Sequence, residues 1–212
     1  MVLSVTEPED IAIRNTIRVW WGHLTLRNNI GLGFVLGIAP QESVQKALNL
    51  EDKHYSDIIV ADFIDTPANR TLKILTAFDW MIQVCPYAPA LLKLDGVVMV
   101  NRNRISTLIR EKSRRAIWGR MLEGAPAGPG YPHSVYPRHA AGGNYLISMS
   151  AVYDLVKASR SPLYLPLEDV WFTGVLASFL SIVLIDEPDL FVYPHSRSDV
   201  IESIGKYGVR HI

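Results

Sequence analysis

The stretch DIIVADFIDTPANRTLKILTAFDWMIQVCPYAPALLKLD, residues 57–95, carries the clearest structural pattern in the chain. An apolar run at Asp57–Ala61 predicts a buried strand, and a second run at Ala90–Leu94 predicts another that ends at Asp95. Residues 69–84 between them predict a helix. The apolar positions with helical spacing are Leu72, Leu75, Ala77, Trp80 and Val84. A strand, a helix and a strand in this order favour parallel pairing through a right-handed crossover.

The segments before this stretch extend the same alternation. Asp10–Trp21 is amphipathic, Gly33–Ile38 predicts a first apolar strand, and Gln41–Lys53 has the periodicity of a helix. The sequence therefore predicts an α/β domain with a mostly parallel central sheet flanked by helices. Ligands of such sheets bind beyond the carboxyl ends of the strands, which is where Asp95 falls.

Composition indicates one globular domain without a dominant charge. The 212 residues are 49% hydrophobic and carry 21 basic and 21 acidic side chains, enough for one core and a single domain over residues 1–212. This balance argues against nucleic acid as a partner. The longest uncharged stretch, Val170–Ile185, is too short to span a bilayer and predicts a buried helix followed by a buried strand. The basic run at 102–115 is either an anion-facing patch or the solvated face of a helix.

Two features bear on the compartment of the protein. Cys85 is the only cysteine, so an intrachain disulfide is excluded, and its apolar neighbours predict a small buried core residue. Asn69-Arg70-Thr71 is an N-glycosylation sequon, which would fit a luminal protein, although such a triplet is expected about once by chance in a chain of this composition.

Two adjacent carboxylates, Glu168 and Asp169, stand where the apolar helix after Leu167 begins. Negative side chains are favoured there by the helix dipole, so an ordinary N-cap pair is one interpretation. The other is that one carboxylate caps the helix while its neighbour faces a cleft for binding or proton transfer. Further upstream, repeated Gly and Pro residues at 123–143 predict an irregular loop, in which Gly142 and Gly143 allow close approach of the backbone.

Six segments follow one another between residues 14 and 174. They are RNTIRVWWG at Arg14–Gly22, FVLG at Phe34–Gly37, EDKHYSDII at Glu51–Ile59, DFIDTPANRTLK at Asp62–Lys73, YPRHAAGGNYLIS at Tyr136–Ser148 and EDVWFTG at Glu168–Gly174. Together they resemble the beta-1,3-galactosyltransferase family, glycosyltransferase family 31. The last three resemble the family patterns D-F-x-D-x-Y-x-N-L-T-L-K, Y-P-x-Y-x-x-G-x-G-Y-V-x-S and E-D-V-Y-x-G.

The resemblance implies a fold of the GT-A type and an inverting transfer of galactose or N-acetylglucosamine from a UDP-sugar to a glycan, glycoprotein or glycolipid acceptor. Asp169 would be the catalytic base, and Glu168 would orient the acceptor or the base. Acceptor binding would fall to Gly142, Gly143 and Tyr145. The residues that would bind the nucleotide sugar are Arg14, Arg18, Asp62, Lys93 and Asp95. Asp62, like Asp65, is alternatively a cap of the next helix.

One departure concerns the metal site. The family carries three consecutive aspartates in K-x-D-D-D-V-F-V-N, which would hold Mn²⁺ against the diphosphate, whereas Lys93–Asn101 reads KLDGVVMVN. Asp95 remains as a ligand of a water-rich Mn²⁺ or Mg²⁺ site or as a partner of the ribose. His195 and His211 fall in the region of the family's histidine ligand, with His211 as the tentative ligand, or are ordinary surface histidines.

Other departures bear on the acceptor side and the compartment. Asn144 replaces the second glycine of the family pattern, which a positive φ would make tolerable. The family implies the Golgi lumen or membrane, yet its paired cysteines, membrane anchor and stem are absent from this sequence. Two functions therefore remain open: an active UDP-sugar hexosyltransferase, or a catalytically inactive relative that binds a glycan or a partner.

Overall fold

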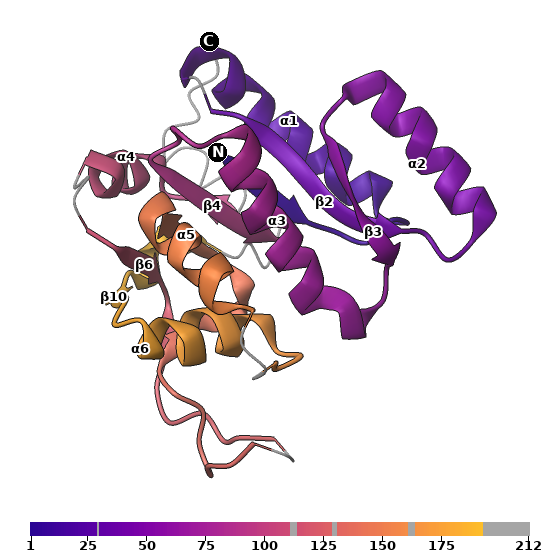
Figure 1. The fold of residues 1–212 in the computed structure, drawn as a ribbon. Helices are drawn as coiled ribbons and strands as arrows, with labels where there is room; N and C mark the ends of the chain where they lie inside the picture. Colours follow the sequence, from indigo (N-terminus) through magenta and orange to yellow (C-terminus); the bar gives the residue numbers. More distant parts are fainter. Residues whose placement is uncertain (29, 111–113, 129–130, 161–163, 193–212) are drawn as a thin grey trace.

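The structure is a computed structural model that describes residues 1–28, 30–110, 114–128, 131–160 and 164–192 (Figure 1), and of residues 22–28 and 192 it describes the backbone alone. A seven-stranded sheet with the order β10-β6-β9-β4-β1-β2-β3 lies at its centre. The strands are β1 (Val2–Val5), β2 (Leu32–Ile38), β3 (Ile58–Ile64), β4 (Ala90–Asp95), β6 (Ala116–Gly119), β9 (Tyr145–Ser148) and β10 (Val183–Asp186). Within this sheet β9 runs antiparallel to both neighbours and the other pairs are parallel. The predicted α/β class is confirmed.

Helices cover both faces of the sheet. The principal ones are α1 (Ile11–Asn28), α2 (Glu42–Tyr55), α3 (Arg70–Val84), α4 (Arg102–Arg110), α5 (Met149–Ala158) and the short α6 (Ala177–Phe179). On one face α3 and α5 lie side by side (Figure 1), with α3 packed on β1 and β2 and α5 on β9, and Ile74, Phe78 and Leu155 belong to the core on this face. On the other face Ile17 and Trp21 of α1 pack with the sheet.

Short elements complete the description. Two further pairs of strands are β5 (Met99–Val100) with β11 (Phe191–Val192), and β7 (Met121–Leu122) with β8 (His139–Ala140). The 3₁₀ turns are η1 (Pro67–Asn69), η2 (Ala141–Gly143) and η4 (Pro188–Leu190). A π-helical segment, η3 (Asp169–Leu176), leads into α6.

Most of the predicted elements are present, with two errors of burial. The strands at Asp57–Ala61 and at the end of Val170–Ile185 were expected to be buried, but β3 and β10 are the two edges of the sheet. Their outer side chains are therefore open to solvent: Val60 is 45% exposed and Val183 is 50% exposed. An apolar run of this length does not show whether a strand has neighbours on both sides.

The buried face of α3 also differs from the prediction. Of the five positions expected to face the core, Ala77 is fully buried, whereas Leu72 and Val84 are exposed. The core face instead runs through Ile74, Ala77, Phe78 and Met81. The side of α3 that was predicted to face the core is also apolar, because α5 packs against part of it.

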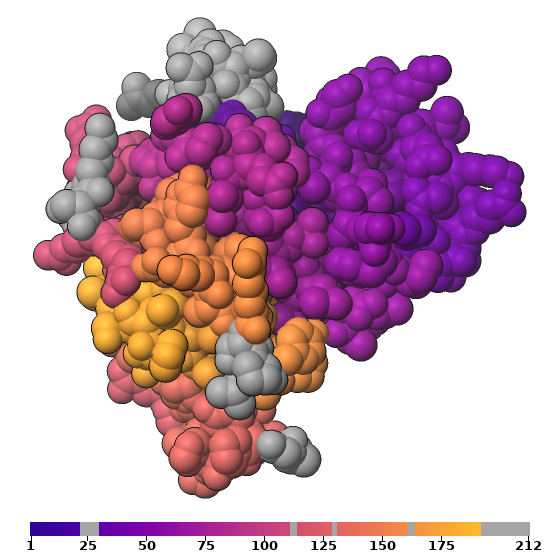
Figure 2. All heavy atoms as spheres, viewed as in Figure 1, coloured from indigo at the N-terminus to yellow at the C-terminus, as the bar shows by residue number. Residues whose placement is uncertain are grey.

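Three further differences complete the comparison with the sequence. The strand at residues 2–5 was not predicted, although it lies in the middle of the sheet. Residues 123–143 were expected to be irregular, and most of the described residues of 123–138 are, but Pro126 bridges Val135, and β8 pairs with β7 just before the segment; its described part projects from the body (Figure 2). Cys85 is half-buried rather than buried.

Candidate active site

The carboxyl ends of β1 and β4 and the first turns of α3 and η3 bring the candidate residues together. β4 contributes Lys93 and Asp95, the segment after β1 contributes Glu7, and Arg70 begins α3. Glu168 precedes η3, since the first residue of that element is Asp169. This is the edge of the sheet at which a ligand was expected.

Lys93 and Glu168 form a buried ion pair at the base of this site. Lys93 Nζ lies 2.5 Å from Glu168 Oε1, with side chains 0% and 4% exposed. The Tyr145 hydroxyl donates to Glu168 Oε2 at 3.5 Å, and the Tyr145 ring lies 5.5 Å from Lys93 Nζ. Burial raises the pKa of Glu168, opposed by Lys93, and raises the pKa of Tyr145 well above its ordinary value. Glu168 therefore joins η3 to β4, and it makes no capping hydrogen bond.

Asp169 is half-buried at the start of η3. Its Oδ1 accepts a hydrogen bond from the Val170 N–H at 2.8 Å, and Oδ2 has no hydrogen-bond partner among the described residues. Thr173 fixes the next turn, because its hydroxyl donates to the Asp169 carbonyl and accepts from the Ala140 N–H. A carboxylate with one bound and one open oxygen is suited to accept a proton, and π-helical turns are frequent at functional sites.

Asp95 is held from two sides. Arg70 Nη2 donates to Asp95 Oδ2, and the Asp95 N–H donates to the Asn144 Oδ1 at 2.8 Å. Asn144 has φ −108°, so the positive φ that would make asparagine tolerable in place of glycine is not adopted and not needed here. Its amide has a different use: Nδ2 donates to the Gly142 carbonyl while Oδ1 accepts from β4, which ties the glycine turn to the strand.

The predicted close approach at Gly142 and Gly143 is confirmed at Gly143. Both glycines have positive φ, 65° and 68°. A Cβ at Gly143 would lie 2.6 Å from Lys93 Nζ, 2.8 Å from Glu168 Oε1 and 3.3 Å from Asp95 Oδ2. The backbone of η2 thus lies directly against three of the candidate side chains.

Arg14 and Arg18 lie on α1, in ion pairs. Arg14 is 1% exposed and donates to Glu51 at 2.8 and 2.6 Å and to the carbonyl of Glu7 at 2.7 Å. Arg18 pairs with Asp57 and Glu51, each at 2.7 Å. Arg14 thereby fixes the segment that carries Glu7. Contact of either arginine with a nucleotide stays a prediction, and among the described residues neither contacts Asp95 or Asp169.

The acidic residues around β3 occupy different environments. Asp62 is exposed on the edge strand, so its role as a nucleotide ligand stays a prediction. Asp65 is buried: its Oδ2 accepts from the Gly37 N–H at 2.7 Å and its Oδ1 lies 2.7 Å from Lys73 Nζ. Lys73 also approaches Glu7 Oε2 at 3.4 Å. Asp65 therefore joins β2 to α3.

Sequence reasoning missed Arg70, Lys73 and Glu7 as parts of this site. Arg70 carried a signal, because it replaces the leucine of the pattern N-L-T-L-K. Glu7 carried none, since its partners lie on α3, more than sixty residues along the chain. The Asn69 amide donates to the Ile64 carbonyl at 2.9 Å, and its glycosylation stays a prediction. His195 and His211 lie outside the described residues.

The described residues do not fit a metal centre built from protein side chains. Within them, no three His, Cys, Asp or Glu side chains are grouped so that they could hold a metal ion. After Asp95 the chain continues with Gly96 and Val97, which offer no side-chain oxygen. Asp95 itself is already paired with Arg70.

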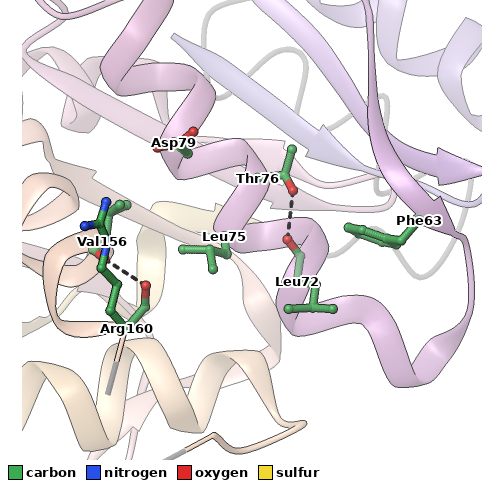
Figure 3. A pocket seen from close by; sticks show the side chains of 8 residues that line it. Phe63, Leu72, Leu75, Thr76, Asp79, Val156 and Arg160 are labelled. Carbon is green, nitrogen blue, oxygen red and sulfur yellow. Dashed lines mark hydrogen bonds between the residues drawn. The ribbon is translucent and has the colours of Figure 1, made fainter. Parts of the chain in front are cut away.

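A surface groove lies apart from these residues, between α3 and α5 (Figure 3). Its volume is about 370 Å³, and Phe63, Leu75, Asp79 and Arg160 are among the side chains that line it. None of the predicted site residues lines this groove. In the part of the chain that the structure describes, no helix has the length and apolar character needed to cross a membrane.

Comparison with known proteins matches the sequence of this chain to one family. The family model described as Galactosyltransferase matches residues 12–188. UDP-GalNAc:beta-1,3-N-acetylgalactosaminyltransferase 1 of Rattus norvegicus is 32% identical over 86% of this chain and 60% of its own length. Beta-1,3-galactosyltransferase 2 of Mus musculus is 28% identical over 93% of this chain and 51% of its own length.

A third relative and one solved structure extend the comparison. Lactosylceramide 1,3-N-acetyl-beta-D-glucosaminyltransferase of Xenopus tropicalis is 31% identical over 89% of this chain and 55% of its own length. The chain thus spans little more than half the length of these relatives. The crystal structure of TarS from S. aureus covers 98% of this chain and 38% of TarS, with a TM-score of 0.51 and 12% identity, a likeness of fold alone. The fold is of the GT-A type, and the chain belongs to the Galactosyltransferase family.

Proposed function

We propose that this chain is the catalytic part of an inverting hexosyltransferase, which moves galactose or an N-acetylhexosamine from a UDP-sugar to a glycan acceptor in beta-1,3 linkage. The observation that carries the proposal is the position of Gly143, whose backbone lies against both Glu168 and Asp95. Glu168 is next in sequence to the candidate base Asp169. Asp95 lies at the end of β4, where a sugar-nucleotide donor is expected. The printed names of the relatives support the reaction class and the sugars.

In the proposed reaction Asp169 takes the proton of an acceptor hydroxyl. The hydroxyl oxygen attacks the anomeric carbon from the face opposite UDP, the bond from that carbon to the diphosphate oxygen breaks, and UDP leaves with the electron pair. Glu168 has a positioning role, because its carboxylate is buried against Lys93 and fixes the start of η3. Membership of the family supports a glycan, glycoprotein or glycolipid as the acceptor and the Golgi as the compartment.

The inactive binding module that the sequence left open has no support in the comparisons, since the relatives are named as transferases. The open oxygen of Asp169 also favours chemistry at this site.

Asp169→Asn tests the proposal, because it keeps the shape of the side chain and removes the base. We expect transfer from a radiolabelled UDP-sugar to fall by about 10²–10⁴-fold, the usual contribution of a general base. The dissociation constant for UDP, measured by calorimetric titration, should change little. Asp79→Asn, on the exposed side of α3, is the matched control and should keep full transfer. Unchanged transfer by Asp169→Asn, or absence of UDP binding by the wild type, would overturn the proposal.

A further inference from the structure

We infer that the guanidinium of Arg70 takes the place of a divalent cation in this site, so that the donor diphosphate binds through Arg70 and needs no metal ion. This inference rests on the proposed function, and it names the group that recognises the diphosphate. It follows from the ion pair at the end of β4, from the side chains around it and from the exposure of the nearby cations.

The first observation is the contact between Arg70 and Asp95. Nη2 of Arg70 donates to Asp95 Oδ2, and Nη1 lies 3.9 Å from Glu7 Oε1. A metal ion bound to Asp95 would have to share its carboxylate with Arg70, whose positive charge would repel the ion. Arg70 and a metal ion would compete for the carboxylate of Asp95, and Arg70 is always present because it is part of the chain.

The second observation is that two changes face each other. The chain has Gly96 and Val97 in place of two aspartates of the family pattern, and Arg70 in place of its leucine. Residue 70 is distant from residue 95 in sequence, yet the fold brings Arg70 and Asp95 into contact. The two oxygen ligands that would hold a cation are lost, and the fixed positive charge of Arg70 is gained beside them. One source of positive charge thus replaces another.

The third observation is exposure. Three cations form ion pairs with Glu7, Asp95 or Glu168 among the described residues, and two of them are enclosed: Lys73 is 1% exposed and Lys93 is 0% exposed. The Arg70 side chain is 32% exposed. Its Nε–H has no hydrogen-bond partner among the described residues.

This geometry suits a phosphate group. A guanidinium presents a planar set of N–H donors that matches phosphate oxygens in pairs, and Asp95 holds one edge of the plane so that the other edge is oriented. Arg70 also stands in the first turn of the 15-residue helix α3, where the backbone dipole favours an anion. Glu7 opposes anion binding by its negative charge, which gives a second way to test the site.

The experiment is calorimetric titration of UDP into wild-type protein, in EDTA and in Mn²⁺, beside Arg70→Leu and Glu7→Gln. Wild type should bind UDP equally well in both buffers, and Arg70→Leu should lose about 10- to 100-fold in affinity in EDTA, the range for hydrogen bonds to a charged group. Glu7→Gln should bind about threefold to fivefold more tightly, because a carboxylate near Arg70 is removed. Such a gain cannot come from misfolding.

Two measurements complete the design. Arg115→Leu removes an arginine from an ion pair of similar exposure with Asp154, away from the site, and should bind UDP like wild type. Mn²⁺ titrated without UDP should show no binding to wild type. Binding of UDP by wild type only in Mn²⁺, or an unchanged affinity of Arg70→Leu in EDTA, would overturn this inference and leave the proposed function standing. Absence of UDP binding under every condition would overturn both.

Discussion

Gly143 is the residue at which a small change should have the largest effect. Its φ of 68° belongs to the left-handed region, and its missing side chain leaves room for Lys93 and Glu168. Gly124 has nearly the same φ, 65°, but a Cβ there would meet nothing within 4 Å. The two glycines therefore separate the conformational cost of a side chain from its steric cost.

We expect Gly143→Ala to lower the free energy of unfolding by about 2–4 kcal/mol and Gly124→Ala by about 1–2 kcal/mol. Both variants bear the cost of the left-handed backbone, and Gly143→Ala alone forces apart the Lys93–Glu168 pair. Urea unfolding of the two variants and the wild type measures the difference. Equal losses would show that the close contacts at Gly143 relax without cost.

For single residues, the charged side chains show what could be predicted from the sequence and what could not. Glu168 and Asp169 were correctly placed at the start of an apolar helix, because that signal is local. Their separate roles, Asp169 as base and Glu168 as orienting residue, came from the resemblance and stay predictions. The ion pair of Glu168 with Lys93 was not visible, since Lys93 lies far away in sequence. The nucleotide contact of Arg14 stays a prediction, and its ion pair with Glu51 was not visible in the sequence, because Glu51 lies on another helix.

At the scale of elements, Glu51 joins α2 to α1. It lies between the guanidinium groups of Arg14 and Arg18, at 2.6 and 2.7 Å. Burial alone would raise its pKa, but the hydrogen bonds and charges of the two arginines bring it below the ordinary value of 4.5. A carboxylate with a lowered folded-state pKa stabilises the fold above its unfolded pKa, and this contribution is lost as the pH falls through the folded-state value.

The wild-type free energy of unfolding should therefore fall as the pH is lowered below about 4.5, partly through Glu51. Glu51→Gln should be less stable than wild type at pH 7, and the difference should shrink towards pH 3. Asp52→Asn, the next residue on α2, is the control and should follow the wild-type pH profile. Chemical unfolding at a series of pH values measures this, and a difference independent of pH would contradict the role given to the charge.

The elements themselves were largely predictable, because their signal is a period within one segment. The errors of exposure at β3, at β10 and on α3 have a common cause, because a local apolar pattern does not show which neighbours cover a side chain. On α3 both Leu72 and Ile74 are apolar, and only the packing of α5 and the sheet decides which is enclosed. β1 escaped prediction because four residues are too few to show a period.

At the scale of the whole molecule, the order of the strands could not be predicted. The alternation of strands and helices correctly implied that β2, β3 and β4 run parallel in one sheet, although it did not include β1, which lies between β2 and β4. It gave no indication that β9 would insert antiparallel between β4 and β6, because strand pairing across such separations depends on packing of the complete sheet.

This order predicts a gradient of stability across the sheet. The amides of β1 and β4 should exchange with deuterium only through global unfolding, since each strand is paired on both sides. The amides of β3 should exchange much faster, because this edge strand has one neighbour and half-exposed side chains. Hydrogen exchange followed by mass spectrometry measures both in one experiment, and equal protection of β1 and β3 would contradict the edge position.

The central place of β1 also has a consequence for synthesis on the ribosome. Val2 pairs with Leu32 on one side and with Leu92 on the other. Because β1 precedes both partner strands in the sequence, it is translated before either of them. The β1–β2 pair can form early, whereas the second side of β1 stays unpaired until β4 has left the exit tunnel. An open apolar strand attracts other chains, so the nascent protein is expected to need chaperones over that interval.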